Sequence, residues 1–305
     1  MVTVCEVGPR DGLQNEPTLL PLEVKAELVR RLVDAGLRRI EVGSFVHPKA
    51  VPQMADTDRL CERIPRSPQV TYAGLVLNEK GFDRAVLAGV QQVNFAFAAT
   101  ETFNQRNQRA STQESLDAFQ QIARRAREAG MRCALTIGAA FGCPFEGEVP
   151  EERIVGFAVR AAEAGADEIV LADTIGVAVP SQVSRLLRHV REAVGNSLPV
   201  GVHLHNTRNT GYANAYAALE AGATIVDAAV GGTGGCPFAP RATGNIATED
   251  LVYMLHRMGI QTGIDLDRLI ETAQWLEAQI GRTLPGQLMK AGGFPPPGTG
   301  LSRAG

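Results

Sequence analysis

Strand-like and helix-like runs of residues alternate along almost the whole chain, and this alternation restricts the fold more than any other feature. The strand-like runs are short and rich in β-branched and aromatic residues, whereas the runs between them repeat apolar residues at helical spacing. Strand-like runs cover residues 2–7, 39–43, 70–76, 92–97, 132–139, 168–172, 199–205 and 224–229. Helix-like runs include residues 22–35, 111–129, 150–164, 181–194 and 211–221.

Eight such strand–helix units predict an α/β fold, a (β/α)8 TIM barrel. Eight units of roughly 30 residues match the ~250 residues that such a barrel typically needs. Several helix-like runs end in Ala-Gly, as at Ala35-Gly36 and Ala129-Gly130, and glycine accepts the left-handed backbone that ends a helix. A doubly wound open sheet is the alternative, but the Gly-rich turn expected after its first strand is absent.

The domain organisation expected from this pattern is one barrel over residues 1–283, followed by a tail. Residues 264–280 repeat apolar side chains at helical spacing and predict an additional C-terminal helix after the eighth unit. From Leu284 the chain is rich in Pro and Gly, with a concentrated run at residues 292–298. We therefore expect residues 284–305 to form a flexible Pro/Gly-rich tail.

Composition and charge exclude several classes of protein. The net charge is −3 with both signs interspersed, so neither nucleic acid nor an anionic membrane is an expected partner. Five cysteines form no CxxC pair, which favours reduced thiols over a disulfide framework. We find no signal-peptide pattern and no apolar run near the roughly 18 residues of a membrane span. These features predict a cytoplasmic protein that does not enter a membrane.

Two histidines, His203 and His205, end the seventh strand-like run. Side chains two residues apart on a strand point to the same face, so both imidazoles share one side while the neighbouring valines face the other. Two imidazoles side by side at a strand end can bind one metal ion. The alternative is a pair of hydrogen-bonded core histidines.

Other strand ends also carry polar residues, and in a barrel these ends converge on one mouth. Arg10-Asp11 follows the first strand, Glu41 ends the second, and Asp173 follows the sixth. Solvated surface charges, or a helix cap in the case of Asp173, are the structural alternatives. Residues 100–107 after the fourth strand predict a polar loop that contacts an anionic ligand or simply faces solvent.

A glycine-rich segment, residues 231–245, follows the eighth strand. Its four glycines within residues 231–235 suit a flap that opens and closes. Cys236 follows them and is either a thiol delivered to a substrate or an inert small side chain. Asn245 ends the segment.

Together the first, seventh and eighth strands direct two oxygen and two nitrogen ligands to one mouth. The predicted ligand set for a divalent metal, Mg or Mn first and Zn or Co as alternatives, is Asp11, His203, His205 and Asn245. Four protein ligands leave two octahedral positions for a chelating substrate.

Several motifs resemble those of the 3-hydroxy-3-methylglutaryl-CoA lyase family, metal-dependent barrel lyases with an Arg-Asp signature. The matching segments are EVGPRDGLQNE at residues 6–16, GCPFEG at 142–147, DTIGV at 173–177, GGCPF at 234–238 and ATGNIATEDL at 242–251. They spread over nearly the whole barrel.

The resemblance implies fold, activity and site residues. It implies retro-Claisen cleavage of a 3-hydroxyacyl-CoA to acetyl-CoA and a keto acid such as acetoacetate, as in leucine degradation, by a homo-oligomer, dimer or tetramer. The metal ligands would be the four residues named above. The implied catalytic residues are Arg10, Cys236, His203, Glu41 and Asp173, with Glu249 behind the metal ligands. The residues expected at the substrate are Arg10, Gln14, Ser44, Asn107, Thr174 and Gly235.

The chain departs from the family pattern just after the second histidine. Where the family usually has His-Asp-Thr-x-Gly-Gln, this chain has HNTRNT at residues 205–210, and Tyr212 adds bulk. We interpret this stretch as lying beside the metal and altering acyl specificity.

Other functions remain open at this point. One is a related lyase for another branched 3-hydroxyacyl-CoA, such as a citramalyl-CoA-like or isohexenyl substrate. Another is a synthase that condenses acetyl-CoA with a 2-keto acid, a function that Asn206 slightly favours. A third is a catalytically inactive barrel that serves as a binding protein, which the intact ligand set disfavours.

Overall fold

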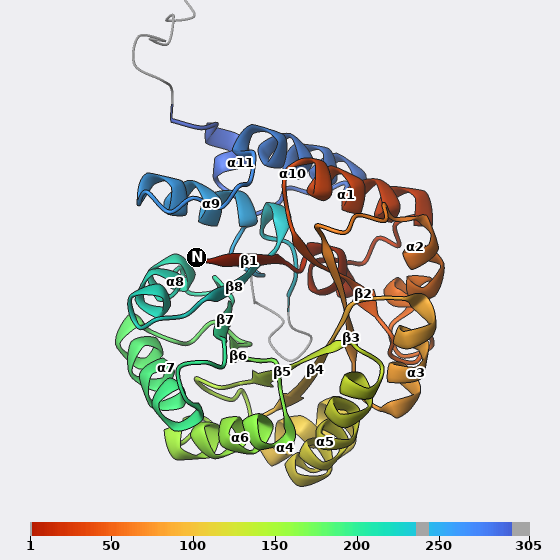
Figure 1. The fold of residues 1–305 in the computed structure, drawn as a ribbon. Coiled ribbons are helices and arrows are strands. Elements are labelled where there is room, and N and C mark those ends of the chain that lie inside the picture. The colour runs from red at the N-terminus through yellow and green to blue at the C-terminus, as the bar shows by residue number, and fades with distance from the viewer. Residues whose placement is uncertain (1, 236–243, 295–305) are drawn as a thin grey trace, which may run out of the picture.

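Eight parallel strands close into a barrel surrounded by helices, which confirms the predicted (β/α)8 fold (Figure 1). The computed structural model describes residues 2–235 and 244–294. The strands are β1 (Thr3–Glu6), β2 (Arg39–Ser44), β3 (Thr71–Val76), β4 (Gln92–Ala98), β5 (Arg132–Gly138), β6 (Glu168–Asp173), β7 (Val200–Leu204) and β8 (Ile225–Ala228). Each lies within two residues of its predicted bounds.

The barrel closes where β8 pairs with β1. Four residue pairs, from Thr3 with Ile225 to Glu6 with Ala228, are in parallel register. Strands β2, β6 and β7 are buried along their entire length because helices cover their outer faces. Two-sided burial explains the apolar runs in β6 and β7, whereas β2 buries Arg39, Glu41 and Ser44 among its apolar residues.

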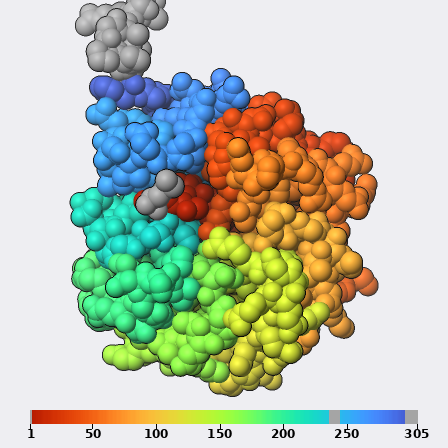
Figure 2. All heavy atoms as spheres, in the orientation of Figure 1, coloured from red at the N-terminus to blue at the C-terminus, as the bar shows by residue number. Residues whose placement is uncertain are grey.

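The helices form the outer ring. They are α1 (Leu22–Asp34), α2 (Thr57–Arg63), α3 (Glu79–Ala88), α4 (Glu101–Gln108), α5 (Thr112–Glu128), α6 (Glu151–Ala164), α7 (Pro180–Val194), α8 (Gly211–Glu220), α9 (Thr248–Arg257), α10 (Leu266–Ile280) and α11 (Leu288–Ala291). Short turns η1 (Gly8–Gly12), η2 (Pro52–Met54) and η3 (Val230–Gly232) follow strands β1, β2 and β8, respectively. The C-terminal helix α10, drawn in blue, packs against the N-terminal α1, drawn in red (Figure 2). No helix in the described ranges combines the length and apolarity needed to cross a bilayer.

The predicted polar loop at residues 100–107 is wrong, because most of this segment is helix α4. Asn104 is fully buried and organises the turn: its Oδ1 accepts the Ala98 N–H at 3.0 Å, and its Nδ2 donates to the carbonyl of Ala110 at 2.9 Å. Phe103 is buried beside it, while the other polar side chains mostly face solvent. Helix α4 therefore has a mostly polar sequence and packs against the barrel through two buried residues, Phe103 and Asn104.

The expected flexible tail is wrong for residues 284–291, which pack against the barrel. The Leu284 side chain is fully buried, and the Gly286 N–H donates to the Gly231 carbonyl at 3.0 Å. The Asp250 carboxylate accepts the N–H groups of Gln287 and Leu288, the latter at 2.7 Å. Buried apolar side chains among the prolines and glycines anchor this segment. Residues 295–305 lie outside the described ranges.

We predict that Leu284→Ala destabilises the protein by about 2–5 kcal/mol, the usual cost of emptying a buried leucine site. Chemical denaturation followed by circular dichroism measures the free energy of unfolding. Leu19→Ala is the control, because Leu19 is 59% exposed and its loss should change stability by no more than about 0.5 kcal/mol. Equal stabilities for Leu284→Ala and the unmodified protein would mean that the segment does not anchor the barrel.

Candidate active site

A cavity of about 590 Å³ opens at the carboxyl ends of the strands, where a barrel of this kind carries its chemistry. Its polar part is lined by Arg10, Asp11, Glu41, Asn94, His203, His205 and Asp227. Its apolar part is lined by Val46, Val51, Leu77, Phe97 and Phe103. The cavity thus combines a cluster of charged groups with a hydrophobic wall.

The turn η1 directs Arg10 and Asp11 towards this cavity. The N–H groups of Arg10, Asp11 and Gly12 all donate to the Val7 carbonyl, which tightens the chain directly after β1. Behind the turn, the Glu6 carboxylate accepts the N–H groups of Gly8 at 2.7 Å and Val230 at 3.0 Å. Burial raises the pKa of Glu6 to about 7 despite these bonds. Glu6 therefore ties the end of β1 to the end of β8.

The Arg10 guanidinium lies between two carboxylates. Its Nε donates to Glu41 Oε2, and its Nη1 donates to Asp11 Oδ1 at 2.6 Å. Burial alone would lower the pKa of Arg10, but Glu41 and Asp11 outweigh it and raise the pKa further, so Arg10 stays cationic. Burial would likewise raise the pKa of Asp11, yet its interactions with Arg10 first, and then with His203 and His205, hold that pKa well below its usual range.

Asp11, His203 and His205 form a cluster whose ligand atoms all lie within 4.8 Å of one another. The Nε2 atoms of the histidines are 3.2 Å apart, and Asp11 Oδ2 is 3.7 Å from the first and 3.9 Å from the second. Burial, followed by the charge of His203, lowers the pKa of His205 to about 4. A neutral His205 keeps a lone pair for a metal, and this donor set fits a divalent cation.

Asn245 reaches the cluster because its segment pairs with the end of β7. Asn245 forms an antiparallel bridge with His205, and the Ile246 N–H donates to the Leu204 carbonyl at 3.1 Å. The Asn245 Nδ2 donates to Asp11 Oδ2 at 2.8 Å, while its Oδ1 is buried without a hydrogen-bond partner. A buried amide oxygen without a donor remains available as a ligand for a cation. The four residues predicted as metal ligands therefore lie together.

Asp227 on β8 is a further candidate functional residue, which was not among those predicted from the sequence. Its Oδ2 lies 3.2 Å from His203 Nδ1, which leaves His203 Nε2 facing the cluster. Burial would lower the pKa of His203, but Asp227 and Asp11 raise it above its ordinary value. A carboxylate behind a histidine orients it as a metal ligand. The sequence signal for Asp227 is a single acidic residue within an otherwise apolar strand.

The other predicted site residues divide into two groups. Gln14, Asn107, Thr174 and Gly235 line the cavity. Ser44 does not: it is fully buried, and its Oγ accepts the Val46 N–H at 3.4 Å. The structure therefore gives no support to a contact of Ser44 with substrate, because its hydroxyl forms a hydrogen bond inside the turn after β2. Cys236 lies outside the described residues.

Asp173 and Glu249 hold backbone turns rather than lining the cavity. The Asp173 carboxylate accepts the N–H groups of Val177 at 2.9 Å and Ala178 at 3.0 Å, so it anchors the turn before α7, and the structure gives no support to a catalytic role. Glu249 accepts the Gly231 N–H at 3.0 Å, and burial raises its pKa to about 8. Glu249 supports the glycine-rich segment rather than the predicted metal ligands directly.

Tyr212 does not add bulk to the active-site cavity, contrary to expectation. Its hydroxyl accepts the Ala247 N–H and donates to Asp250 Oδ2, each at 2.9 Å. Together with Asn206 and Asn245 it lines a second cavity, of about 530 Å³. The unusual stretch at residues 206–212 therefore supports the segment that carries Asn245 and does not line the main cavity.

Comparisons with known proteins place the chain among CoA lyases. The family model described as HMGL-like matches residues 1–276. An (R)-citramalyl-CoA lyase from Chloroflexus aurantiacus is 48% identical and the match covers 95% of each chain. A hydroxymethylglutaryl-CoA lyase from Bacillus subtilis is 42% identical over 93% of this chain and 95% of its own length. The structure of an HMG-CoA lyase from Acinetobacter baumannii, in complex with coenzyme A and 3-methylmalate, has a TM-score of 0.92 at 42% identity and covers 97% of this chain and 98% of that chain.

We predict a graded loss of Mn²⁺ affinity across three variants measured by calorimetric titration. Replacing an outer-shell partner typically costs about 10- to 100-fold in metal affinity, so Asp227→Asn should fall in that range. His205→Ala should lose more, because it removes a ligand atom. His189→Ala is the control, since His189 is half-exposed on α7 and pairs with Glu151. A His205→Ala protein that binds Mn²⁺ like the unmodified one would refute the ligand assignment.

We also predict that Tyr212→Phe lowers the free energy of unfolding by about 1–3 kcal/mol, since it leaves the Ala247 N–H and Asp250 with one partner fewer. Tyr216→Phe, on the same helix and 47% exposed, should leave stability unchanged. Thermal or denaturant unfolding compares the two. Equal effects of the two substitutions would show that the Tyr212 hydroxyl contributes nothing to stability.

Proposed function

The chain belongs to the HMGL-like family and is a carbon–carbon lyase acting on a CoA thioester, and we propose that it cleaves a 3-hydroxy-3-methyl acyl-CoA that ends in a carboxylate. The products would be acetyl-CoA and a keto acid. The observation that carries this proposal is the cluster of Asp11, His203 and His205 beside the Arg10 guanidinium in one cavity.

Two substrates fit this description and differ by one methylene group. Citramalyl-CoA would give pyruvate, and 3-hydroxy-3-methylglutaryl-CoA would give acetoacetate. The 48% identity to a citramalyl-CoA lyase favours the first, and the similarity to hydroxymethylglutaryl-CoA lyases favours the second. The bound 3-methylmalate of the Acinetobacter enzyme is also a hydroxy acid with a nearby carboxylate, as citramalate is.

Asp11, His203, His205 and Asn245 would hold the divalent metal, with Mg²⁺ or Mn²⁺ as the first candidates and Zn²⁺ or Co²⁺ as alternatives. When bound, such an ion lowers the pKa of a hydroxyl group that it contacts. The protein must then accept the hydroxyl proton. One histidine nitrogen cannot bind the metal and accept this proton at once, so a carboxylate lining the cavity is the better acceptor. We assign this role to Asp227, whose Oδ2 contacts His203, whereas Glu41 is engaged through both oxygens.

Arg10 would stabilise the charge that develops on the thioester oxygen as the carbon–carbon bond breaks. Two of its N–H groups bind Glu41 and Asp11, so three of the five guanidinium donors are left for substrate. A fixed cation in a partly buried site stabilises an enolate better than the same charge in water does.

Cys236 would donate a proton to the carbon of the acetyl-CoA enolate. A thiol with an ordinary pKa near 8.5 is mostly protonated at neutral pH and can act as an acid. This assignment rests on the sequence and the family. Gly235, its neighbour in the chain, lines the cavity and accepts a hydrogen bond from Asn15 at 2.9 Å, which supports delivery of residue 236 to the site.

We further propose that the protein is a cytoplasmic homo-oligomer, with leucine degradation as its context if 3-hydroxy-3-methylglutaryl-CoA is the substrate. The described cysteines are unpaired, which supports a reducing compartment. The expected partner is the CoA thioester itself.

The substrate assignment predicts metal-dependent release of acetyl-CoA from citramalyl-CoA, 3-hydroxy-3-methylglutaryl-CoA or both, followed by mass spectrometry. Chelation should stop the release, and added Mg²⁺ or Mn²⁺ should restore it. The isohexenyl analogue and an acetyl-CoA plus 2-keto acid mixture complete the panel. Product from the mixture with no cleavage of any thioester would instead identify a condensing synthase, and no reaction in either direction would favour a binding protein.

Cys236→Ser should reduce turnover by at least about 100-fold, the usual scale of general acid catalysis. Its Mn²⁺ affinity should not change, because Cys236 is not among the proposed ligands. Cys61→Ala is the matched control, since Cys61 lies on α2 and does not line the cavity. Unchanged turnover in Cys236→Ser would assign the thiol a structural role.

A further inference from the structure

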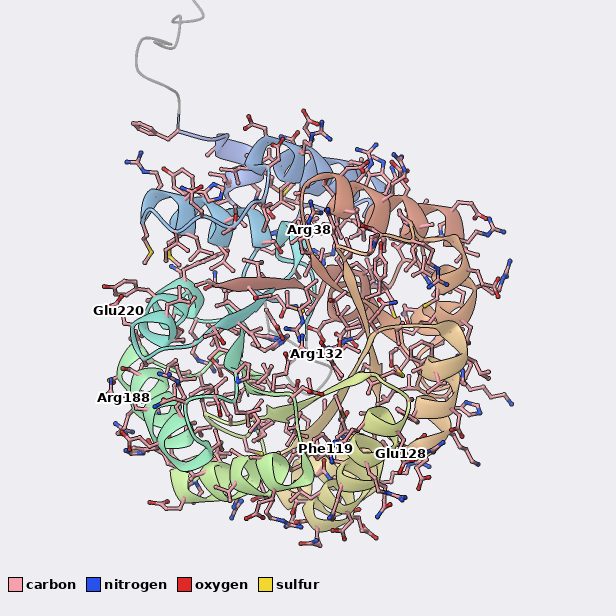
Figure 3. The ribbon with its side chains drawn as sticks, viewed as in Figure 1. Arg38, Phe119, Glu128, Arg132, Arg188 and Glu220 are labelled. Atoms are coloured by element: carbon pink, nitrogen blue, oxygen red, sulfur yellow. The ribbon has the colours of Figure 1, made fainter. Side chains whose placement is uncertain are left out.

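A continuous line of hydrogen-bonded side chains runs inside the barrel from the amino-terminal ends of the strands to Arg10. It starts at Glu168, the first residue of β6, which pairs with Arg39 and with Arg132 at 3.1 Å. Arg132 begins β5 and lies over the centre of the ring in Figure 3. The line then passes through Gln92 and Asn94 on β4, although neither residue has a role in the reaction described above.

The hydrogen bonds of this line fix which way the Asn94 amide points. Gln92 Nε2 donates to Glu168 Oε1 at 2.9 Å and to Asn94 Oδ1 at 2.7 Å. The Asn94 oxygen is thereby held towards Gln92, so its Nδ2 faces Glu41 and donates to Oε1 at 2.7 Å. The Glu168 carboxylate can only accept hydrogen bonds, so Gln92 must turn its Nε2 towards it. Rotating the Asn94 amide would then place the Asn94 Nδ2 against the Gln92 Nε2, and both are donors.

Asn94 and Arg10 together account for both oxygens of Glu41. Asn94 binds Oε1, while the Arg10 Nε binds Oε2. Glu41 is only 1% exposed, so water cannot readily replace a missing donor. Loss of the Asn94 amide would leave one carboxylate oxygen free to turn towards Arg10 and pull the guanidinium out of its present orientation.

We propose that Asn94 is a positioning residue, which sets the orientation of Arg10 by holding Glu41 in place. The inference rests on the proposed function, in which Arg10 stabilises the enolate. Asn94 also lines the cavity, so its amide stands at the edge of the space available to the acyl group. Gln92 and Glu168 act behind it by fixing the amide.

Two substitutions separate this role from packing. Asn94→Ala removes the amide, and Asn94→Leu fills its volume without a donor. Since a buried group left without its partner costs about 1–3 kcal/mol, we expect either change to lower kcat by roughly 5- to 150-fold. KM should change less than about threefold and Mn²⁺ affinity should be unaltered. Full activity in Asn94→Leu would overturn the proposal, because it would show that only volume matters.

A double-mutant cycle tests whether Asn94 acts through Glu41. Residues that act through one another are not additive, so Glu41→Gln/Asn94→Ala should be no slower than Glu41→Gln alone. Fully additive losses would overturn the proposal. Asn196→Ala is the matched control, because Asn196 is exposed in the turn after α7 and should leave kcat unchanged.

Crystal structures of Asn94→Ala and Asn94→Leu give a readout that does not depend on turnover. We expect the contact between Arg10 Nε and Glu41 to be displaced in both variants and retained in Asn196→Ala. An Arg10 that stays in place in both Asn94 variants would overturn the inference. If the unmodified enzyme cleaves no thioester while Arg10 still moves in the variants, the proposed function fails and the positioning role stands.

Discussion

Closure of the barrel between its first and last strands is the constraint on which the site depends. The parallel register of β1 with β8 brings the ends of both strands to one mouth, and the Glu6 carboxylate then joins them through Gly8 and Val230. As a result Asp11 and Asn245, 234 positions apart in the chain, are joined by a hydrogen bond. The segment that carries Asn245 inserts beside the end of β7 and so reaches His205 as well. Among the four proposed metal ligands, only His203 and His205 are near each other in the sequence.

The electrostatics of the cavity explain why this geometry suits a divalent cation. Among the residues that the structure describes, three carboxylates, those of Asp11, Glu41 and Asp227, line the cavity with one guanidinium, that of Arg10. The Nε2 atoms of His203 and His205 lie 3.2 Å apart in the same cluster. Such an arrangement is costly to bury unless a positive charge is added. A divalent ion would supply it, and the hydrogen bonds of Arg10 to Glu41 and Asp11 keep the guanidinium at the edge of the cluster rather than within it.

The strands, and the clustering of the four candidate ligands, could be predicted from the sequence because each depends on local patterns. Buried parallel strands give apolar runs, and a metal site at strand ends gives polar residues just after them. Asp227 and Asn94 were missed because a single polar residue in a strand does not show its partner, which lies 24 residues away for Asp227 and 53 for Asn94. Tyr212 was placed wrongly because proximity to His205 in sequence does not tell on which side of the backbone a side chain lies. Leu284 was missed because prolines and glycines around it resemble a tail.

Anomalous diffraction from crystals of the protein grown with Mn²⁺ tests the central claim most directly. The metal site described above predicts one strong anomalous peak within about 2.0–2.3 Å of Asp11 Oδ2 and of the Nε2 atoms of His203 and His205, distances usual for oxygen and imidazole ligands. The Asn245 Oδ1, which is buried without a partner, should turn to the same peak. A fully occupied Mn²⁺ bound elsewhere, with the two histidines still facing each other across an empty gap, would contradict it.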